Sequence, residues 1–202
     1  MCEPSDVGEI DGRGIRVVVL VEGESDRNAL HALAERRGLD LAAAGVAVEP
    51  VGGAQAMGRA LERFGPGGAG LGVAALYDAG EEGAVARCLE RAGLGTVLGR
   101  EDMERLGFFA CDEDLEAELI RALGVRGVEQ VVAAQGELRS FRVLQRQPAQ
   151  REVPVERQLR RFLGTHSGRK IRYGRLLVEA LDLDSVPRPL DRVLARACSA
   201  AA

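Results

Sequence analysis

The chain has 202 residues, of which 46% are apolar and 29% are charged, so its composition is that of a folded globular protein rather than a disordered one. Four scattered cysteines without a CxxC pair, together with only two histidines, argue against a zinc site or a disulfide framework. The longest apolar run, residues 15–21, is too short to span a membrane, and the acidic N-terminus is no secretory signal. We therefore expect a cytoplasmic protein with no membrane partner.

The net charge of −4 hides an asymmetry between two parts of the chain. Residues 1–138 carry 13 basic and 25 acidic side chains, whereas residues 139–202 carry 14 basic and 6 acidic ones. An acidic part can concentrate cations and a basic part can hold a polyanion. Of the 27 basic residues only Lys170 is a lysine. It marks a position where a compact ammonium could be required in place of a planar guanidinium.

The elements expected up to residue 124 alternate between strand and helix. Residues 1–14 are rich in glycine and acid and are expected to be flexible. Residues 15–21 form a β-branched run typical of a strand buried on both faces, and a helix follows that ends at Gly38. Further strands are expected at 45–51, 73–77 and 107–111, with helices at 53–64, 82–91 and 112–123 and a linker at 93–105.

This order predicts an α/β fold with a mainly parallel four-stranded sheet flanked by helices, a Rossmann-like core at residues 15–124. Beyond residue 125 no strand pattern is found, and prolines separate the expected helices. These helices are expected at 128–138, 155–163, 169–181 and 190–197. We therefore expect residues 125–202 to be an all-helical C-terminal extension that carries the basic face and Lys170.

Acidic residues follow three of the expected strands. Glu22 and Asp26 come after the first strand, Asp78 after the third, and the segment 112–116, which includes Asp114 and Glu116, after the fourth. The carboxyl ends of parallel strands meet at one edge of the sheet, where ligands bind. Carboxylates that converge there repel one another unless a cation or a proton joins them. A metal site is the favoured interpretation, although each acid taken alone could simply cap a helix.

The segment Glu22-Gly-Glu-Ser-Asp26, placed directly after a strand, is similar to the opening motif of TOPRIM domains, and its form resembles that of the OLD (overcoming lysogenization defect) nucleases. The resemblance extends over about residues 15–181. It implies that Glu22 acts in metal binding or acid–base chemistry and that Lys170 completes the site. It further implies one or two Mg²⁺ or Mn²⁺ ions held by Glu22, Asp26, Asp78, Asp114 and Glu116.

One position departs from the family pattern. The acidic motif after the third strand is usually Asp-x-Asp, but its second acid is replaced here by Gly80. Glu81 or Glu82 would have to reach into the site, or one cation would be held more weakly. Two-metal catalysis is therefore in doubt, and Glu82 is a further candidate ligand. The ATPase part of OLD proteins is also absent from this sequence, so a separate ATPase subunit is expected as a partner.

The predicted function is metal-dependent endonucleolytic hydrolysis of DNA, with RNA as the other possible substrate. The alternative is a catalytically weak or inactive TOPRIM subunit that binds nucleic acid or an ATPase partner. With two tyrosines and no tryptophan, base stacking contributes little, so binding is expected to be sequence-independent and sensitive to salt. The arginines expected to contact the DNA backbone are Arg157, Arg160, Arg161, Arg169, Arg172 and Arg175.

Overall fold

The sheet at the centre of the molecule consists of four parallel strands in the order β2-β1-β3-β4. The computed structural model describes residues 14–96, 99–165 and 167–202, so nearly all of the predicted flexible segment 1–14 lies outside the described residues. In the register of the sheet, Val19 of β1 lies between Val48 of β2 and Ala74 of β3. The strands are β1 (Val17–Val21), β2 (Val46–Pro50), β3 (Gly72–Asp78) and β4 (Phe108–Cys111).

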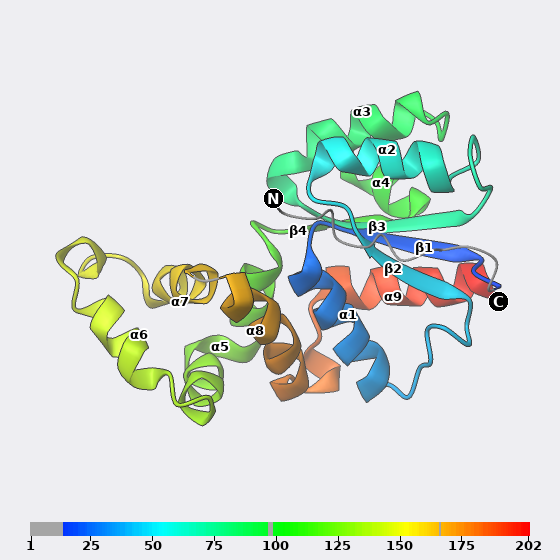
Figure 1. Cartoon of the computed structure of the whole chain (residues 1–202). Helices are drawn as coiled ribbons and strands as arrows, with labels where there is room; N and C mark the ends of the chain where they lie inside the picture. Colours follow the sequence, from blue (N-terminus) through cyan, green and yellow to red (C-terminus); the bar gives the residue numbers. More distant parts are fainter. Residues whose placement is uncertain (1–13, 97–98, 166) are drawn as a thin grey trace, which may run out of the picture.

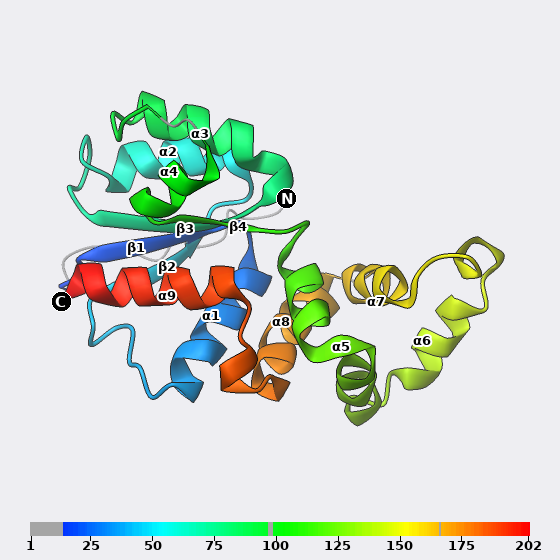
Figure 2. The same cartoon turned by 180° about the vertical axis from the view of Figure 1, so that it is seen from behind.

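Helices cover both faces of this sheet, as Figure 1 and the reverse view in Figure 2 show. Three of them lie on one face: α2 (Ala54–Phe64), α3 (Glu82–Arg91) and α4 (Arg100–Leu106). The other face is covered by α1 (Glu24–Arg36) and by α9 (Arg188–Ala201). All five side chains of β1 are buried, and they alternate between the two apolar cores. A strand buried on both faces explains the uninterrupted β-branched run in the sequence.

The predicted fold class is confirmed, and the four strands lie within two residues of their expected positions. Helix α4 is the first of two helices that were not predicted. It begins inside the segment 93–105, which was expected to be a linker, and ends at Leu106. Its only buried side chain is Met103, and it is bounded by Gly99 and by Gly107, whose φ of 94° ends the helix in the left-handed conformation. A single buried residue in seven is too weak a periodic signal to indicate a helix.

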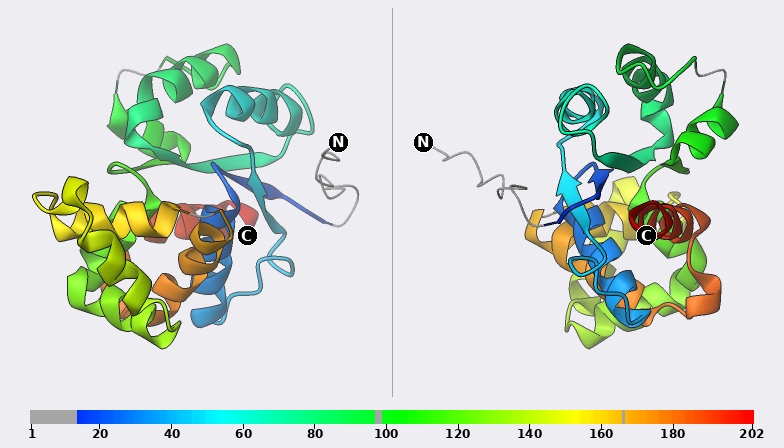
Figure 3. Two further views of the ribbon diagram at one scale, coloured as in Figure 1. Left: turned by 60° about the vertical axis from the view of Figure 1, so that its left-hand side comes forward. Right: turned by 90° about the vertical axis from the view of Figure 1, so that its right-hand side faces the viewer.

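A helical arm projects from the sheet, most clearly in Figures 1 and 2, and Figure 3 shows it from two further directions. It is built from α5 (Leu115–Ala134), α6 (Leu138–Gln145) and α7 (Val155–Gly164). A non-helical Gly124 (φ 67°, ψ 163°) divides α5 at a kink into two helical segments, in agreement with the separate helices expected at 112–123 and 128–138. Helix α6 was not predicted.

Helix α8 (Ser167–Ala180) packs along α1 and links the arm to the sheet. The last helix, α9, packs on β3 and β4, so residues from the C-terminal part of the chain cover the sheet. The domain boundary at residue 124 stays a prediction, with the kink of α5 at that position. None of the helices within the described ranges combines the length and apolar character that a membrane span requires.

Candidate active site

A cavity of about 320 Å³ lies at the carboxyl edge of the sheet and collects acids from three strand ends. Glu22 follows β1, Asp78 ends β3 and Asp114 follows β4, so the topology itself brings them to this edge. Six predicted site residues line the cavity: Glu22, Asp26, Asp78, Asp114, Glu116 and Lys170. The structure therefore brings together residues that are as far apart in the sequence as 22 and 170.

Lys170 and Glu116 form the contact that joins the helical part of the chain to the acidic edge. The Lys170 Nζ atom lies 3.2 Å from Glu116 Oε2, and the Glu116 side chain is 5% exposed. Burial opposes the charged form of Lys170, but the Glu116, Asp26 and Asp114 carboxylates outweigh it and raise the pKa of the lysine. The side chain is therefore an ammonium over the whole physiological pH range.

Ser25 holds the other oxygen of the Glu116 carboxylate and was not singled out for this role in the sequence. The buried Ser25 hydroxyl donates to Glu116 Oε1 (2.9 Å) and also lies 3.3 Å from the main-chain oxygen of Lys170. A Cβ atom on Gly174 would lie only 2.5 Å from the Ser25 main-chain oxygen. The absence of a side chain at Gly174 thus lets α8 approach the start of α1 and places Lys170 over the cavity.

Asp26 combines a structural role with a place in the cavity. Its Oδ2 atom accepts a hydrogen bond from the Gly23 main-chain N–H (2.9 Å) at the start of α1, which is the capping role weighed from the sequence. The carboxyl is only 9% exposed. Burial and then the charge of Glu116 raise the pKa of Asp26 to about 6. The raised pKa of Asp26 indicates that too little positive charge lies nearby to stabilise its carboxylate form.

Asp78 and Glu22 form a second pair of acids at the ends of β3 and β1. Burial, followed by the charge of Glu22 and a hydrogen bond with it, raises the pKa of Asp78 to about 8. The pair therefore holds a proton more tightly than a solvent-exposed carboxyl group would. Two carboxyl groups that share one proton bind it in place of a cation. This arrangement fits a hard divalent ion such as Mg²⁺ or Mn²⁺, which prefers carboxylate oxygens.

Asp114 is engaged on both of its oxygens. Its Oδ1 atom accepts from the Ala117 N–H (2.8 Å) and caps α5, and its Oδ2 atom accepts from Arg160 Nε of α7 (2.6 Å). Arg160 also donates to Glu113 Oε2 (2.8 Å), and Glu113 adopts a positive φ of 71°, which is uncommon for a residue with a side chain. Arg160, predicted to contact DNA, therefore reaches the edge of the acidic cavity.

No three acidic, histidine or cysteine side chains within the described ranges are arranged closely enough to hold an ion as they stand. The contacts above give the reason. Lys170 occupies one oxygen of Glu116 and Arg160 occupies one oxygen of Asp114. To bind Glu116 and Asp114, a divalent ion would therefore have to replace the Lys170 ammonium and the Arg160 guanidinium at these oxygens, which requires the side chains to rotate.

Glu82 is not among the residues that line the cavity. Its carboxylate instead pairs with Arg100 of α4 at 2.8 Å. Glu81, the other residue expected to compensate for Gly80, is not among the residues that line the cavity either. A Cβ atom built on Gly80 would meet nothing within 4 Å. The space for an acid at this position is open.

The arginines expected to bind DNA fall into two groups. Four are held by acids of the same chain: Arg160 as described, Arg169 and Arg172 by Glu137, and Arg175 by Glu35 and Glu179. Arg169 also stacks on the Phe162 ring at 4.2 Å. Arg157 and Arg161 are exposed, and no ion pair to either is found among the described residues. The role of all six in DNA binding stays a prediction.

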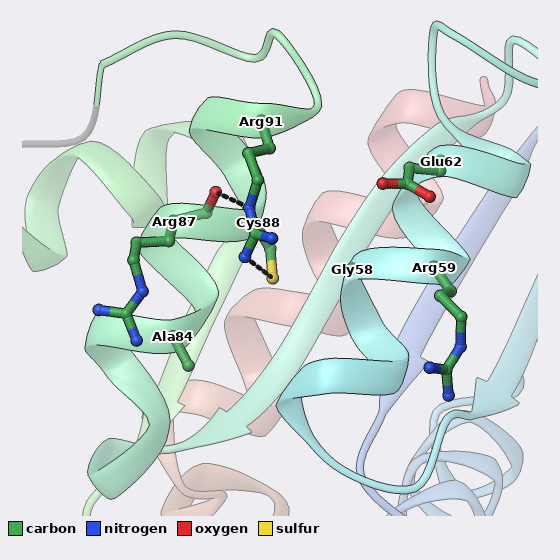
Figure 4. A pocket seen from close by; sticks show the side chains of 7 residues that line it. All are labelled: Gly58, Arg59, Glu62, Ala84, Arg87, Cys88 and Arg91. Carbon is green, nitrogen blue, oxygen red and sulfur yellow. Dashed lines mark hydrogen bonds between the residues drawn. The ribbon is translucent and has the colours of Figure 1, made fainter.

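A second hollow, of about 390 Å³, lies between α2 and α3 on the face of the sheet that α2, α3 and α4 cover, and it is shown in Figure 4. Three arginines line it, but their guanidinium groups do not converge. The Arg87 side chain points away from the hollow, whereas Arg91 lies across it with Nη2 3.9 Å from Cys88 Sγ. We assign no role to this hollow.

The fold and its acidic edge define an α/β domain with carboxylates gathered at the carboxyl ends of a parallel sheet, and comparison with known proteins gives the family it resembles. Residues 15–79 match the family described as "Overcoming lysogenization defect protein-like, TOPRIM domain". No match was found among curated proteins.

Two solved structures resemble nearly the whole chain. The C-terminal region of the Burkholderia pseudomallei OLD protein is 23% identical, with a TM-score of 0.68 over 93% of this chain and 99% of that one. The C-terminal region of the Xanthomonas campestris pv. campestris OLD protein is also 23% identical, with a TM-score of 0.70 over 93% and 94%. The predicted resemblance to OLD-type TOPRIM domains is confirmed, and so is the C-terminal helical region of the fold.

Proposed function

We propose that this protein is a metal-dependent nuclease that hydrolyses phosphodiester bonds in DNA. The observation that carries the proposal is the meeting of six acids, five of them predicted site residues, and one ammonium in a single cavity at the carboxyl edge of the sheet. The elevated pKa values of Asp26 and Asp78 support it, because they indicate a cluster that is short of positive charge. The donor set consists of hard oxygens, which fits one or two Mg²⁺ or Mn²⁺ ions.

The roles of the side chains follow from their chemistry. When bound, a divalent ion supplies Lewis-acid chemistry at the phosphodiester. Asp78, Asp114 and Glu116 would hold the ion. Glu22, next to Asp78, is placed to ligate as well or to accept the proton of the attacking water. The ammonium of Lys170, kept charged by its acidic neighbours, offsets the negative charge that develops on the phosphate.

The test is cleavage of supercoiled plasmid with Mg²⁺, with Mn²⁺ and with EDTA. We expect cleavage with either ion and none with EDTA. Glu22→Gln and Lys170→Ala should each reduce the rate by at least about 100-fold, whereas Glu62→Gln, an acid-to-amide change on the opposite layer, should leave it unchanged. Cleavage by the Lys170→Ala variant at the parental rate would remove Lys170 from the mechanism.

A second candidate function is a catalytically weak or inactive subunit that binds nucleic acid or a separate ATPase. Gly80 favours it, because the usual second acid of the motif is missing and neither Glu81 nor Glu82 lines the cavity. The same plasmid assay separates the two. Absence of cleavage with both ions, in a protein that still binds Mn²⁺ and DNA, would favour the inactive subunit.

A further inference from the structure

The helical arm carries an excess of positive charge that its own acids do not neutralise. Residues 125–165 contain eight arginines and four glutamates. Glu129 pairs with Arg142, and Glu137 pairs with two arginines of α8. Within the described part of the chain, six exposed arginines of the arm have no acidic partner: Arg126, Arg139, Arg146, Arg151, Arg157 and Arg161.

The helical repeat places several of these arginines on the same face of their helix. On α6, Arg139, Val143 and Arg146 are spaced i, i+4, i+7, and Val143 is 56% exposed, whereas Phe141 and Leu144 are buried. They therefore share the outer face of α6. On α7, Arg157 and Arg161 are one turn apart.

Helix α7 also connects this surface to the acidic cavity. Arg160 lies beside Arg157 and Arg161 on α7, and its Nε atom contacts Asp114 at 2.6 Å. A smaller cavity of about 230 Å³ between α5 and α7 is lined by Arg157, Arg160 and Glu113. The basic surface thus begins at the candidate active site and continues outward along the arm shown in Figure 1.

The arginines of α8 differ, although the sequence places them in the same basic segment. Arg172 is bound by Glu137 and Arg175 by Glu35 and Glu179. Pairing within the protein cancels most of their attraction for a distant anion. A polyanion would therefore meet net positive charge on the α6–α7 side of the cavity and a neutralised surface on the α8 side.

The burial of the aromatic residues favours double-stranded over single-stranded nucleic acid as the ligand. All five phenylalanines and both tyrosines are buried, none more than 6% exposed. Proteins that bind single strands stack the bases on exposed aromatic rings, and this protein offers no such ring. Contacts from arginine to phosphate remain, and these hold a duplex without reading its sequence.

We propose that the arginine track, defined as Arg139, Arg146, Arg151, Arg157 and Arg161, binds the phosphate backbone of duplex DNA on one side of the cavity. This inference rests on the proposed function for its choice of DNA as the ligand. The proposal places the stretch of DNA next to the cleavage position on α6 and α7 rather than on α8.

The test measures binding of a 30-base-pair DNA duplex in EDTA, where cleavage cannot occur, so its outcome is independent of whether the protein is a nuclease. The track variant combines Arg146→Gln, Arg157→Gln and Arg161→Gln. The matched control combines Arg142→Gln, Arg172→Gln and Arg175→Gln, three arginines paired with acids. Both variants lower the net charge by the same amount, and thermal unfolding checks that both are folded.

We expect the track variant to bind the duplex about 10- to 100-fold more weakly at 100 mM salt, and the dependence of log K on log salt to be shallower by up to about 3. The control should bind within about threefold of the parent. Equal losses in the two variants, tighter binding of a single strand than of the duplex, or no binding by the parent at low salt would each overturn the proposal.

Discussion

Replacement of Gly174 by alanine tests whether the close approach of α8 to α1 places Lys170. The new Cβ atom would lie 2.5 Å from the Ser25 main-chain oxygen and 2.9 Å from its hydroxyl, closer than the 3.0 Å that real Cβ contacts respect. The two helices must therefore separate by about 0.5 Å or more, since the nearer of these neighbours is a main-chain atom. Overpacking of this kind costs about 1–3 kcal/mol.

The same helix supplies a matched control. Gly168 also lies in α8, but a Cβ atom there would meet nothing within 4 Å. Alanine favours the helix over glycine by up to about 1 kcal/mol at either position. The difference between the two variants therefore isolates the contact with Ser25. We expect Gly174→Ala to be less stable than Gly168→Ala by about 1–3 kcal/mol, or about 2–12 °C in Tm.

Two assays test the effect of Gly174→Ala, one on stability and one on activity. Thermal unfolding measures the stability difference, and plasmid cleavage measures the effect on the site. Because α8 carries Lys170, its displacement should lengthen the contact of Lys170 with Glu116 and lower the cleavage rate of Gly174→Ala but not that of Gly168→Ala. Equal stability and equal cleavage rates for the two variants would refute the reasoning.

Three further changes test other parts of the account. Asp78→Asn should weaken Mn²⁺ binding by at least about tenfold in calorimetry, because an amide cannot give up a proton to offer the ion a charged oxygen, and an unchanged titration would place the ion elsewhere. Gly80→Asp, which enters open space, should add a second and weaker Mn²⁺ site by equilibrium dialysis; an unaltered stoichiometry would count against a two-ion pattern. The pKa of Glu137 is lowered by Arg172 and Arg169 despite its burial, so its ion pairs should stabilise the fold above pH 4.5 and fade as the pH falls. The Tm deficit of Glu137→Gln relative to the parent should thus be largest at pH 7 and shrink as the pH falls below 4.5, and a deficit that does not change with pH would exclude the ion pairs as its cause.

The sheet and the acids at its edge could be predicted because each depends on a local pattern. A run such as residues 15–21 specifies a buried strand, and the carboxyl ends of parallel strands must meet. Glu22, Asp78 and the segment 112–116 were expected at one edge on this basis, and the family resemblance singled out Asp114 within that segment. The structure places these three acids in one cavity. Lys170 followed from the family resemblance and from its being the only lysine.

The remaining features depend on contacts between distant segments. Whether an arginine is paired cannot be seen from its position in the chain: Glu35 lies 140 residues from Arg175, which it holds. Ser25 and Gly174 were not assigned a joint role, because a small residue in a helix gives no sign of which segment packs on it. Glu82 was a reasonable ligand by spacing, but Arg100, in a helix that was not predicted, holds its carboxylate.

The most direct test of the central claim is a crystal of the protein soaked in Mn²⁺ and measured for anomalous scattering. The account predicts at least one peak within coordinating distance of Asp78 and of Glu22 or Glu116, with Lys170 or Arg160 displaced from its present carboxylate. A crystal that takes up Mn²⁺ only outside this cavity, with both ion pairs intact, would contradict the account.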